Sequence, residues 1–142
     1  MRARRSATLL LLLVLFGLHL LAARQLSQTA DESAHVAGGY AVLKRGLAAL
    51  PVLAQRGYPP LLPALEALPV FLGDPGIAIE QLAGWPDHYD VYAAAFAEAI
   101  IADARARLSS RLPTIWLSLL LAALVTRWAQ DLGDNLPNRG HL

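Results

Sequence analysis

The chain has 142 residues, a formal net charge of +1 and a mean hydropathy of +0.42. Apolar residues make up 56% of it, above the ~45–50% of an ordinary soluble domain. The near-zero net charge predicts neither a nucleic-acid partner nor an acidic substrate. Because cysteine is absent, disulfide frameworks, thiolate metal sites and cysteine nucleophiles are excluded.

A charge-free, leucine-rich run at residues 6–23 follows the basic start Arg2-Ala3-Arg4-Arg5. About 18 residues at ~1.5 Å per residue make roughly 27 Å, enough to cross the hydrocarbon core of a bilayer. The positive-inside rule predicts a cytoplasmic stub at residues 1–5 and an outer location for the residues after the span. The alternative is a signal peptide, whose apolar region usually has only ~7–15 residues and whose cleavage would release a secreted helical protein.

A second apolar run at residues 112–129 predicts another transmembrane helix, followed by a cytoplasmic tail at residues 130–142. The intervening residues 24–111 contain no run of alternating β-branched residues, so we expect them to be helical. The predicted fold class is an all-α membrane protein. It has two transmembrane helices joined by an amphipathic, helical extracytoplasmic loop.

Three helices are expected in this loop, and each has a predicted boundary signal. Pro51 is expected to end the first helix, and Pro69 to interrupt the second. Asp87 is expected to cap the third. Such helices lie along a membrane surface or pack on other helices. Their apolar stripes are Val36, Tyr40, Leu43, Leu47 and Leu50 in the first, Leu61, Leu62, Leu65 and Leu68 in the second, and Tyr89, Tyr92, Phe96 and Ile100 in the third.

The acidic pair Asp31 and Glu32, with His35, is the leading candidate for chemistry. Asp31 and His35 are four residues apart, so they project from one face of a helix, and Glu32 borders that face. A carboxylate there can act as a general base that accepts a proton from an acceptor hydroxyl or amine. Asp31 and His35 are also candidate ligands of a divalent metal. Alternatively, Thr29 and Glu32 match a capping box, and the acidic residues only begin a helix.

Three further polar features carry weaker signals. Residues 86–90 form a cluster that either completes a metal site with His35 or caps a helix. His19 is an ionisable residue inside the first span. Arg105, Arg107 and Arg111 precede the second span and either contact lipid phosphate or snorkel to the interface. No nucleophile elbow, P-loop, dinucleotide fingerprint or zincin motif is present, so those enzyme classes have no support.

The order of several motifs resembles the amino-terminal part of GT-C type membrane glycosyltransferases. This group includes the dolichyl-phosphate-mannose–protein mannosyltransferases and the bacterial lipid-A aminoarabinose transferases. The similarity covers roughly residues 2–132. The motifs that carry it are Asp31-Glu32-x-x-His35, Gly39-Tyr40, Tyr58-Pro59-Pro60-Leu61, Ala67-Leu68-Pro69, Arg111-Leu112-Pro113 and Arg127-Trp128-Ala129, after a basic start and one span.

The resemblance implies an inverting transfer of a sugar from a polyprenyl-phosphate donor to an acceptor at the outer face of a membrane, in a bacterium the inner membrane. Asp31 would be the base or a metal-linked carboxylate, with a divalent metal as the candidate cofactor. Glu32 and His35 would support it. The further candidates for substrate contact are Tyr40, Tyr58 and Arg111.

The sequence departs from the family pattern at Tyr58, where many members carry histidine, and at Pro63, where lysine is common. Family members build their donor groove from many more spans. We therefore expect this chain to be the amino-terminal portion of a longer enzyme, inactive alone, with membrane lipid, the polyprenyl-phosphate sugar and further membrane helices as partners. The alternatives are a small two-span membrane interaction protein and a secreted helical protein.

Overall fold

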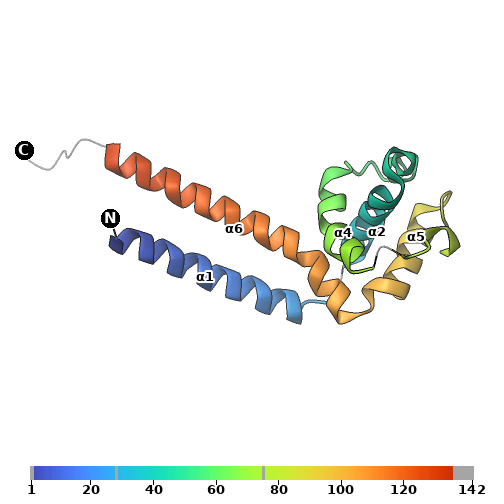
Figure 1. Cartoon of the computed structure of the whole chain (residues 1–142), viewed down its shortest axis with the longest axis horizontal. Coiled ribbons are helices and arrows are strands. Elements are labelled where there is room, and N and C mark those ends of the chain that lie inside the picture. Colours follow the sequence, from blue (N-terminus) through green and yellow to red (C-terminus); the bar gives the residue numbers. More distant parts are fainter. Residues whose placement is uncertain (1, 28, 75, 136–142) are drawn as a thin grey trace, which may run out of the picture. The chain divides into compact units, whose positions relative to one another are not determined.

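The structure, a computed structural model, describes residues 2–27, 29–74 and 76–135, and every regular element in those ranges is helical. The predicted all-α class is thereby confirmed. In chain order the elements are α1 (Arg2–Gln25), α2 (Ala30–Arg45), a 3₁₀ turn (Gly46–Ala49), α3 (Leu50–Ala54), α4 (Leu61–Gly73), a 3₁₀ turn (Ile79–Gln81), α5 (Tyr89–Phe96), a π-helical turn (Ala97–Ile101) and α6 (Ala104–Asn135) (Figure 1).

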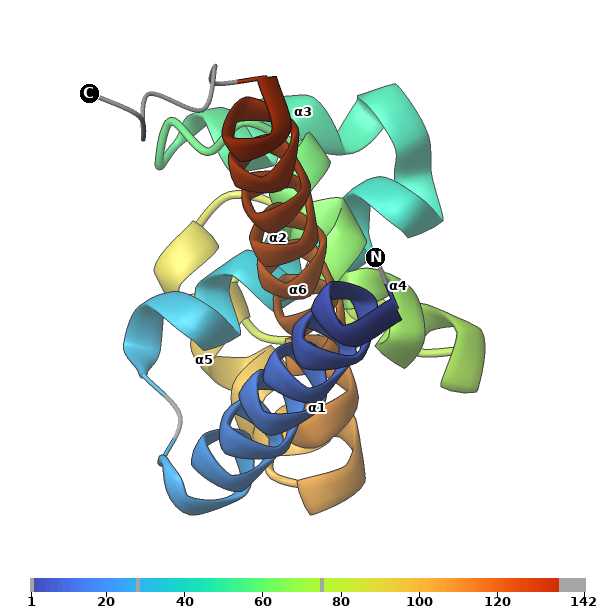
Figure 2. The same ribbon diagram turned by 90° about the vertical axis from the view of Figure 1, so that its left-hand side faces the viewer.

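The helices form two compact units, which are described separately. Unit 1 contains Met1–Ala22 and Thr114–Leu142, and unit 2 contains Ala23–Pro113. In unit 1, α1 and the second part of α6 lie side by side (Figure 2). Their leucines are mostly exposed, and Phe16 packs against Trp116 with ring centroids 5.7 Å apart. Helices with this much exposed apolar surface need an apolar environment or a partner.

Three segments among the described residues are helical, long and apolar enough to cross a membrane: Ser6–Gln25, Asp31–Ala54 and Ala104–Gly133. The first and last contain the two predicted spans, and α6 begins at Ala104 rather than at residue 112. The additional segment differs from them, because half of its apolar window is buried inside the protein. It is also broken at Gly46, whose φ of 59° favours glycine.

Unit 2 has a core in which α2 packs against α4 and α5. The predicted face of α5 is confirmed, because Tyr89, Tyr92 and Phe96 are buried. The Tyr92 hydroxyl donates a hydrogen bond to the Ala37 carbonyl over 2.9 Å, so its polar atom is satisfied inside the core. The fully enclosed large side chains are Tyr40, Tyr92, Phe96, Leu53, Ile79, Ile101, Val36 and Pro63.

The two proline boundaries predicted for the loop helices are wrong. The first helix ends at Arg45, and Pro51 instead lies in the first turn of α3, where a missing N–H leaves no bond unmade. Pro69 lies inside α4, which continues to Gly73. Packing of α4 against α2 outweighs the hydrogen bond that this proline removes.

Two smaller expectations for the loop helices also fail. Asp87 does not cap α5, because His88 occupies the N-cap position and makes no side-chain capping bond. Leu47, expected in the buried stripe of the first helix, is 82% exposed. It lies in the 3₁₀ turn that follows Arg45, so the helical spacing that placed it beside Tyr40 no longer applies.

The leucine stripe of α4 faces outward instead of toward the core. Pro63, Ala67 and Val70 are the buried residues of this helix. The reason is the close approach of α2, because a Cβ built on Gly39 would lie only 1.8 Å from the Pro63 carbonyl oxygen. Small side chains permit that approach, and the bulky leucines are left outside. The exposed residues are Leu61, Leu62, Leu65, Leu68 and Leu72.

Replacing Gly39 with alanine should destabilise unit 2 strongly. The added methyl group meets backbone atoms of α4, and over-packing of this kind costs about 1–3 kcal/mol of unfolding free energy. Near-UV circular dichroism of the full chain during denaturant unfolding measures the loss. Gly73→Ala is the control, because nothing lies within 4 Å of the added atom there. Equal stability of the two variants would contradict the close-approach explanation.

Candidate functional site

The candidate site begins at the amino terminus of α2, where Thr29 starts the helix. Thr29 has extended backbone angles, and its Oγ1 accepts a hydrogen bond from the Glu32 amide over 3.3 Å. This is the N-cap arrangement that the sequence allowed. The Glu32 carboxylate, however, pairs with Arg111. Thr29 therefore accounts for the start of the helix, and Glu32 has a second role.

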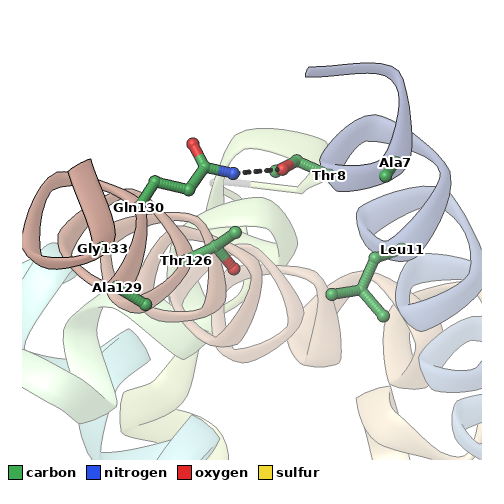
Figure 3. Close-up of a pocket in the computed structure, with 7 residues that line it drawn as sticks. All are labelled: Ala7, Thr8, Leu11, Thr126, Ala129, Gln130 and Gly133. Atoms are coloured by element: carbon green, nitrogen blue, oxygen red, sulfur yellow. Dashed lines mark hydrogen bonds between the residues drawn. The ribbon is translucent and has the colours of Figure 1, made fainter. Parts of the chain in front are cut away.

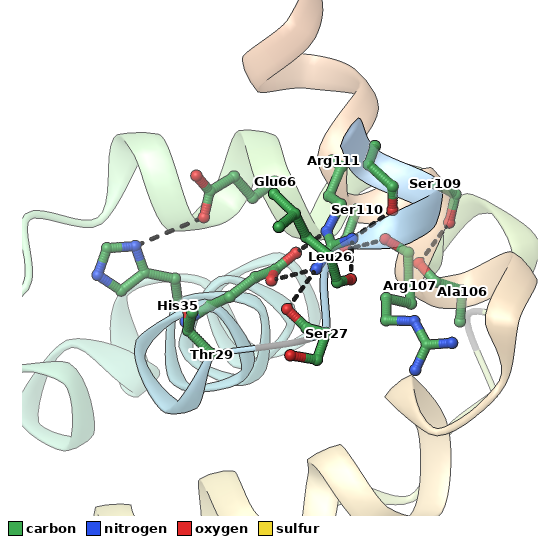
Figure 4. Close-up of polar contacts among 12 residues, drawn as sticks. Leu26, Ser27, Thr29, His35, Glu66, Ala106, Arg107, Ser109, Ser110 and Arg111 are labelled. Atoms are coloured by element: carbon green, nitrogen blue, oxygen red, sulfur yellow. Dashed lines mark hydrogen bonds and ion pairs between the residues drawn. The ribbon is translucent and has the colours of Figure 1, made fainter. Parts of the chain in front are cut away.

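Arg111 binds Glu32 and the segment that leads into α2, an arrangement we call the arginine bracket (Figure 4). Its Nε and Nη2 donate to the two Glu32 carboxylate oxygens, with 2.8 Å between Nη2 and Oε2. Its remaining N–H groups donate to the carbonyls of Ala23, Leu26 (3.0 Å) and Ser27 (3.3 Å). The planar guanidinium suits this two-point pairing with a carboxylate.

The bracket corrects the expected role of Arg111 as a substrate contact. A guanidinium has five N–H donors, and each of the five makes one of these bonds. The Arg111 and Glu32 side chains are only 13% and 22% exposed. Arg111 has no N–H donor left for a substrate, and its pairing with Glu32 positions the start of α2.

His35 points toward α4 and away from the bracket (Figure 4). Its Nδ1 lies 3.5 Å from Glu66 Oε2, and its ring packs edge-on against Tyr58 with centroids 4.5 Å apart. Tyr58 is half-buried and packs in turn against Tyr89. Sequence reasoning missed Glu66, although a single acidic residue in the leucine-rich α4 was a usable signal. Tyr58 and His35 thus form one aromatic contact.

The metal site expected from these residues is not assembled. Across the part of the chain that the structure describes, no three His, Asp, Glu or Cys residues are grouped so as to hold a metal ion. Because His35 contacts Glu66 and Tyr58, Asp31 has no set of ligands to join. The donors present do not fit a divalent metal, which needs several oxygen or nitrogen ligands.

Tyr40 is also corrected, because its side chain is fully buried. Its hydroxyl donates to the Asp74 carbonyl over 2.7 Å, and its ring packs against Phe71 and Phe96. A substrate cannot reach it, so it is a core residue. Tyr89 behaves similarly: burial raises its pKa, which keeps the hydroxyl protonated as a donor to the Ala34 carbonyl.

Asp31 is the site carboxylate that remains open. It is exposed on the first turn of α2, and within the described ranges no residue makes a hydrogen bond or ion pair with its carboxylate. Its neighbour Glu32 is neutralised by Arg111. The structure therefore separates the two acidic residues: Glu32 is paired with Arg111, and Asp31 is exposed.

Residues 86–90 do not join His35. Asp90 pairs with Arg56, whose Nε lies 2.7 Å from Oδ1. Gln55 donates to the Pro86 carbonyl over 3.1 Å and accepts from the Tyr89 amide over 3.0 Å. These bonds tie α3 to α5 around a cavity of about 270 Å³. The cluster has a structural explanation.

His19 is satisfied inside unit 1. Its Nδ1 lies 2.8 Å from the Leu15 carbonyl and its Nε2 lies 3.3 Å from Ser118 Oγ. Gln130 and Thr8 form a second polar contact between the same helices, 2.9 Å long, beside a cavity of about 460 Å³ (Figure 3). These contacts hold α1 against α6. They give His19 a structural role that accounts for an ionisable residue inside the first predicted span.

Comparison with known proteins gives no relative: no family model, no curated protein and no solved structure matches this chain. The resemblance to GT-C type enzymes therefore depends on its ordered motifs alone. The assignment of Asp31 as the open carboxylate depends on the geometry of unit 2.

Breaking the arginine bracket should destabilise unit 2. Glu32→Gln leaves a partly buried guanidinium without its counter-charge, a loss of roughly 1–3 kcal/mol of unfolding free energy. Arg111→Lys should be no milder, because an ammonium cannot reproduce five directed bonds. Denaturant unfolding of the full chain measures both. The control is Arg56→Gln, which breaks an exposed ion pair and should leave stability unchanged. An equal loss of unfolding free energy in Glu32→Gln, Arg111→Lys and Arg56→Gln would show that the bracket stabilises unit 2 no more than an exposed ion pair does.

Proposed function

We propose that this chain is the amino-terminal portion of an integral-membrane glycosyltransferase of the GT-C type. It moves a sugar from a polyprenyl-phosphate donor to an acceptor. In this proposal α1 and α6 span a membrane, in a bacterium the inner membrane, with the amino terminus cytoplasmic and unit 2 at the outer face. The observation that carries the proposal is the open carboxylate of Asp31, which lies shortly after a membrane-length helix.

The proposed reaction uses Asp31 as the general base. Asp31 accepts the proton of the acceptor hydroxyl or amine as that group bonds to the anomeric carbon of the sugar. The bond between that carbon and the phosphate oxygen breaks, and its electron pair leaves with the phosphate. Attack opposite the leaving group inverts the configuration. The step is written without a metal, because among the described residues no three His, Cys, Asp or Glu are grouped so as to hold one.

Glu32 and His35 support Asp31 indirectly. Pairing of Glu32 with Arg111 fixes the first turn of α2, on which Asp31 lies. Contact of His35 with Glu66 holds the next turn against α4. The long isoprenoid of the donor needs apolar surface beyond α1 and α6, so the proposal includes further membrane helices as partners.

Asp31→Asn should reduce sugar transfer by at least about 100-fold, the lower range of what a general base contributes. The assay uses membranes in which the chain is expressed with its natural partners, and follows labelled sugar leaving a polyprenyl-phosphate donor. Glu98→Gln removes another exposed carboxylate of unit 2 and serves as the matched control. Transfer that survives Asp31→Asn at the wild-type rate would refute this role.

A two-span interaction protein is the second candidate, and the outward leucine face of α4 favours it. This function predicts that Asp31→Asn is harmless, whereas Leu61→Gln with Leu72→Gln abolishes co-purification of a membrane partner. A secreted protein would instead show Arg24 as its mature amino terminus. Mass spectrometry of the intact chain distinguishes that case from the two anchored ones.

A further inference from the structure

Three arginines line one cavity of about 240 Å³ in unit 2. Arg24 comes from the last turn of α1, and Arg105 and Arg107 come from the first turn of α6. The rest of the lining is Ala23, Ala104 and Leu108. The cavity therefore combines three positive charges with a small apolar wall.

These arginines differ from the other cationic residues of unit 2. Within the described ranges, no residue makes a hydrogen bond or ion pair with the guanidinium group of Arg24, Arg105 or Arg107, and that of Arg107 points away from the bracket (Figure 4). The other cations all have partners: Arg45 with Glu80, Arg56 with Asp90, Arg111 with Glu32, and Lys44 with the Ile77 carbonyl.

The nearest carboxylate along the chain, Asp103, is already engaged by the backbone. Its Oδ2 accepts hydrogen bonds from the amides of Arg105 (3.0 Å) and Ala106 (2.9 Å), which caps the start of α6. It moderates the positive end of the helix but makes no bond to the guanidinium groups. The cavity keeps a surplus of positive charge.

The three arginines stand at the ends of the two membrane-length segments. Ser6–Gln25 includes Arg24 near its end, and Ala104–Gly133 begins beside Arg105. Lipid phosphates lie at this depth when such helices span a bilayer, and arginine side chains extend toward them. Positive charge on the predicted outer side also opposes the positive-inside rule, which indicates a local reason for its presence.

We propose that Arg24, Arg105 and Arg107 bind the phosphate group of a membrane lipid, with the apolar wall of the cavity against the start of its tail. Guanidinium groups bind phosphate through paired, charge-assisted hydrogen bonds. The phosphate can belong to an anionic phospholipid or to a polyprenyl lipid. The site rests on the membrane insertion proposed above and is independent of the chemistry of Asp31.

The test measures lipid binding to the purified full chain in uncharged detergent by native mass spectrometry. Separate titrations use phosphatidylglycerol, a polyprenyl phosphate and inorganic phosphate. The variant is Arg105→Gln with Arg107→Gln. The matched control is Arg45→Gln with Arg56→Gln, which removes the same charge from arginines that already have partners. Circular dichroism verifies that both variants keep their helical content.

The double variant should bind the phosphate lipid on the order of 30-fold more weakly, since each arginine near a lipid surface contributes about a fivefold factor. The control should bind as the wild type does. The lipid with the higher affinity identifies the source of the phosphate. Unchanged binding in the variant, an equal loss in the control, or inorganic phosphate binding as tightly as either lipid would overturn the proposal.

Membrane insertion is tested separately by extraction of membranes with alkaline carbonate. A chain that is extracted overturns the insertion on which this site rests. A chain that stays inserted but shows no dependence on Arg105 and Arg107 overturns the site alone. Loss of insertion would also overturn the proposed integral-membrane glycosyltransferase. Loss of the lipid site alone would leave that function standing, and Asp31→Asn tests the function separately.

Discussion

The arginine bracket between Arg111 and Glu32 is the constraint on which the candidate site depends. It joins residues 79 positions apart, near the two ends of unit 2, and uses every N–H donor of the guanidinium. Without it the carbonyls of Ala23, Leu26 and Ser27 would lose their bonds to the guanidinium. Because α2 also carries Gly39 and the centre of the core, the bracket fixes the entry to the helix around which unit 2 is packed.

The same interaction assigns different roles to two adjacent carboxylates. Consecutive helical residues point about 100° apart, so Asp31 and Glu32 cannot both face Arg111. Glu32 takes the guanidinium, and Asp31 remains exposed. An acidic pair in which one member is neutralised by a fixed cation gives a single basic group at a defined place. Asp31 therefore lies exposed on a turn whose position is fixed by the pairing of its neighbour.

Local patterns in the sequence predicted those features that local forces decide. Apolar length predicted α1 and the apolar part of α6, the 3–4 spacing predicted the buried face of α5, and Thr29 predicted a helix start. The outward face of α4 was not predictable this way. The leucines of α4 are its larger apolar side chains, yet they face outward. The close approach of α2 at Gly39 leaves room only for smaller side chains on the inward face of α4. Pro69 was misjudged for the same reason, because packing between helices overrode a local rule.

The candidate site shows the same division between local and long-range information. Spacing alone placed Asp31 and His35 on one face, but it could not show that Glu66 would attract His35 or that Arg111 would capture Glu32. Net charge was equally limited as a guide. The formal net charge of +1 predicted no charged partner, yet four arginines lie near the two ends of unit 2. The carboxylates there are already bonded, Glu32 to the Arg111 side chain and Asp103 to the backbone amide of Arg105. All the guanidinium N–H donors of Arg111 bond within unit 2, whereas those of Arg24, Arg105 and Arg107 make no hydrogen bond to a described residue. A small total charge is therefore compatible with a strong local one, and the local charge decides what an interface of this kind can bind.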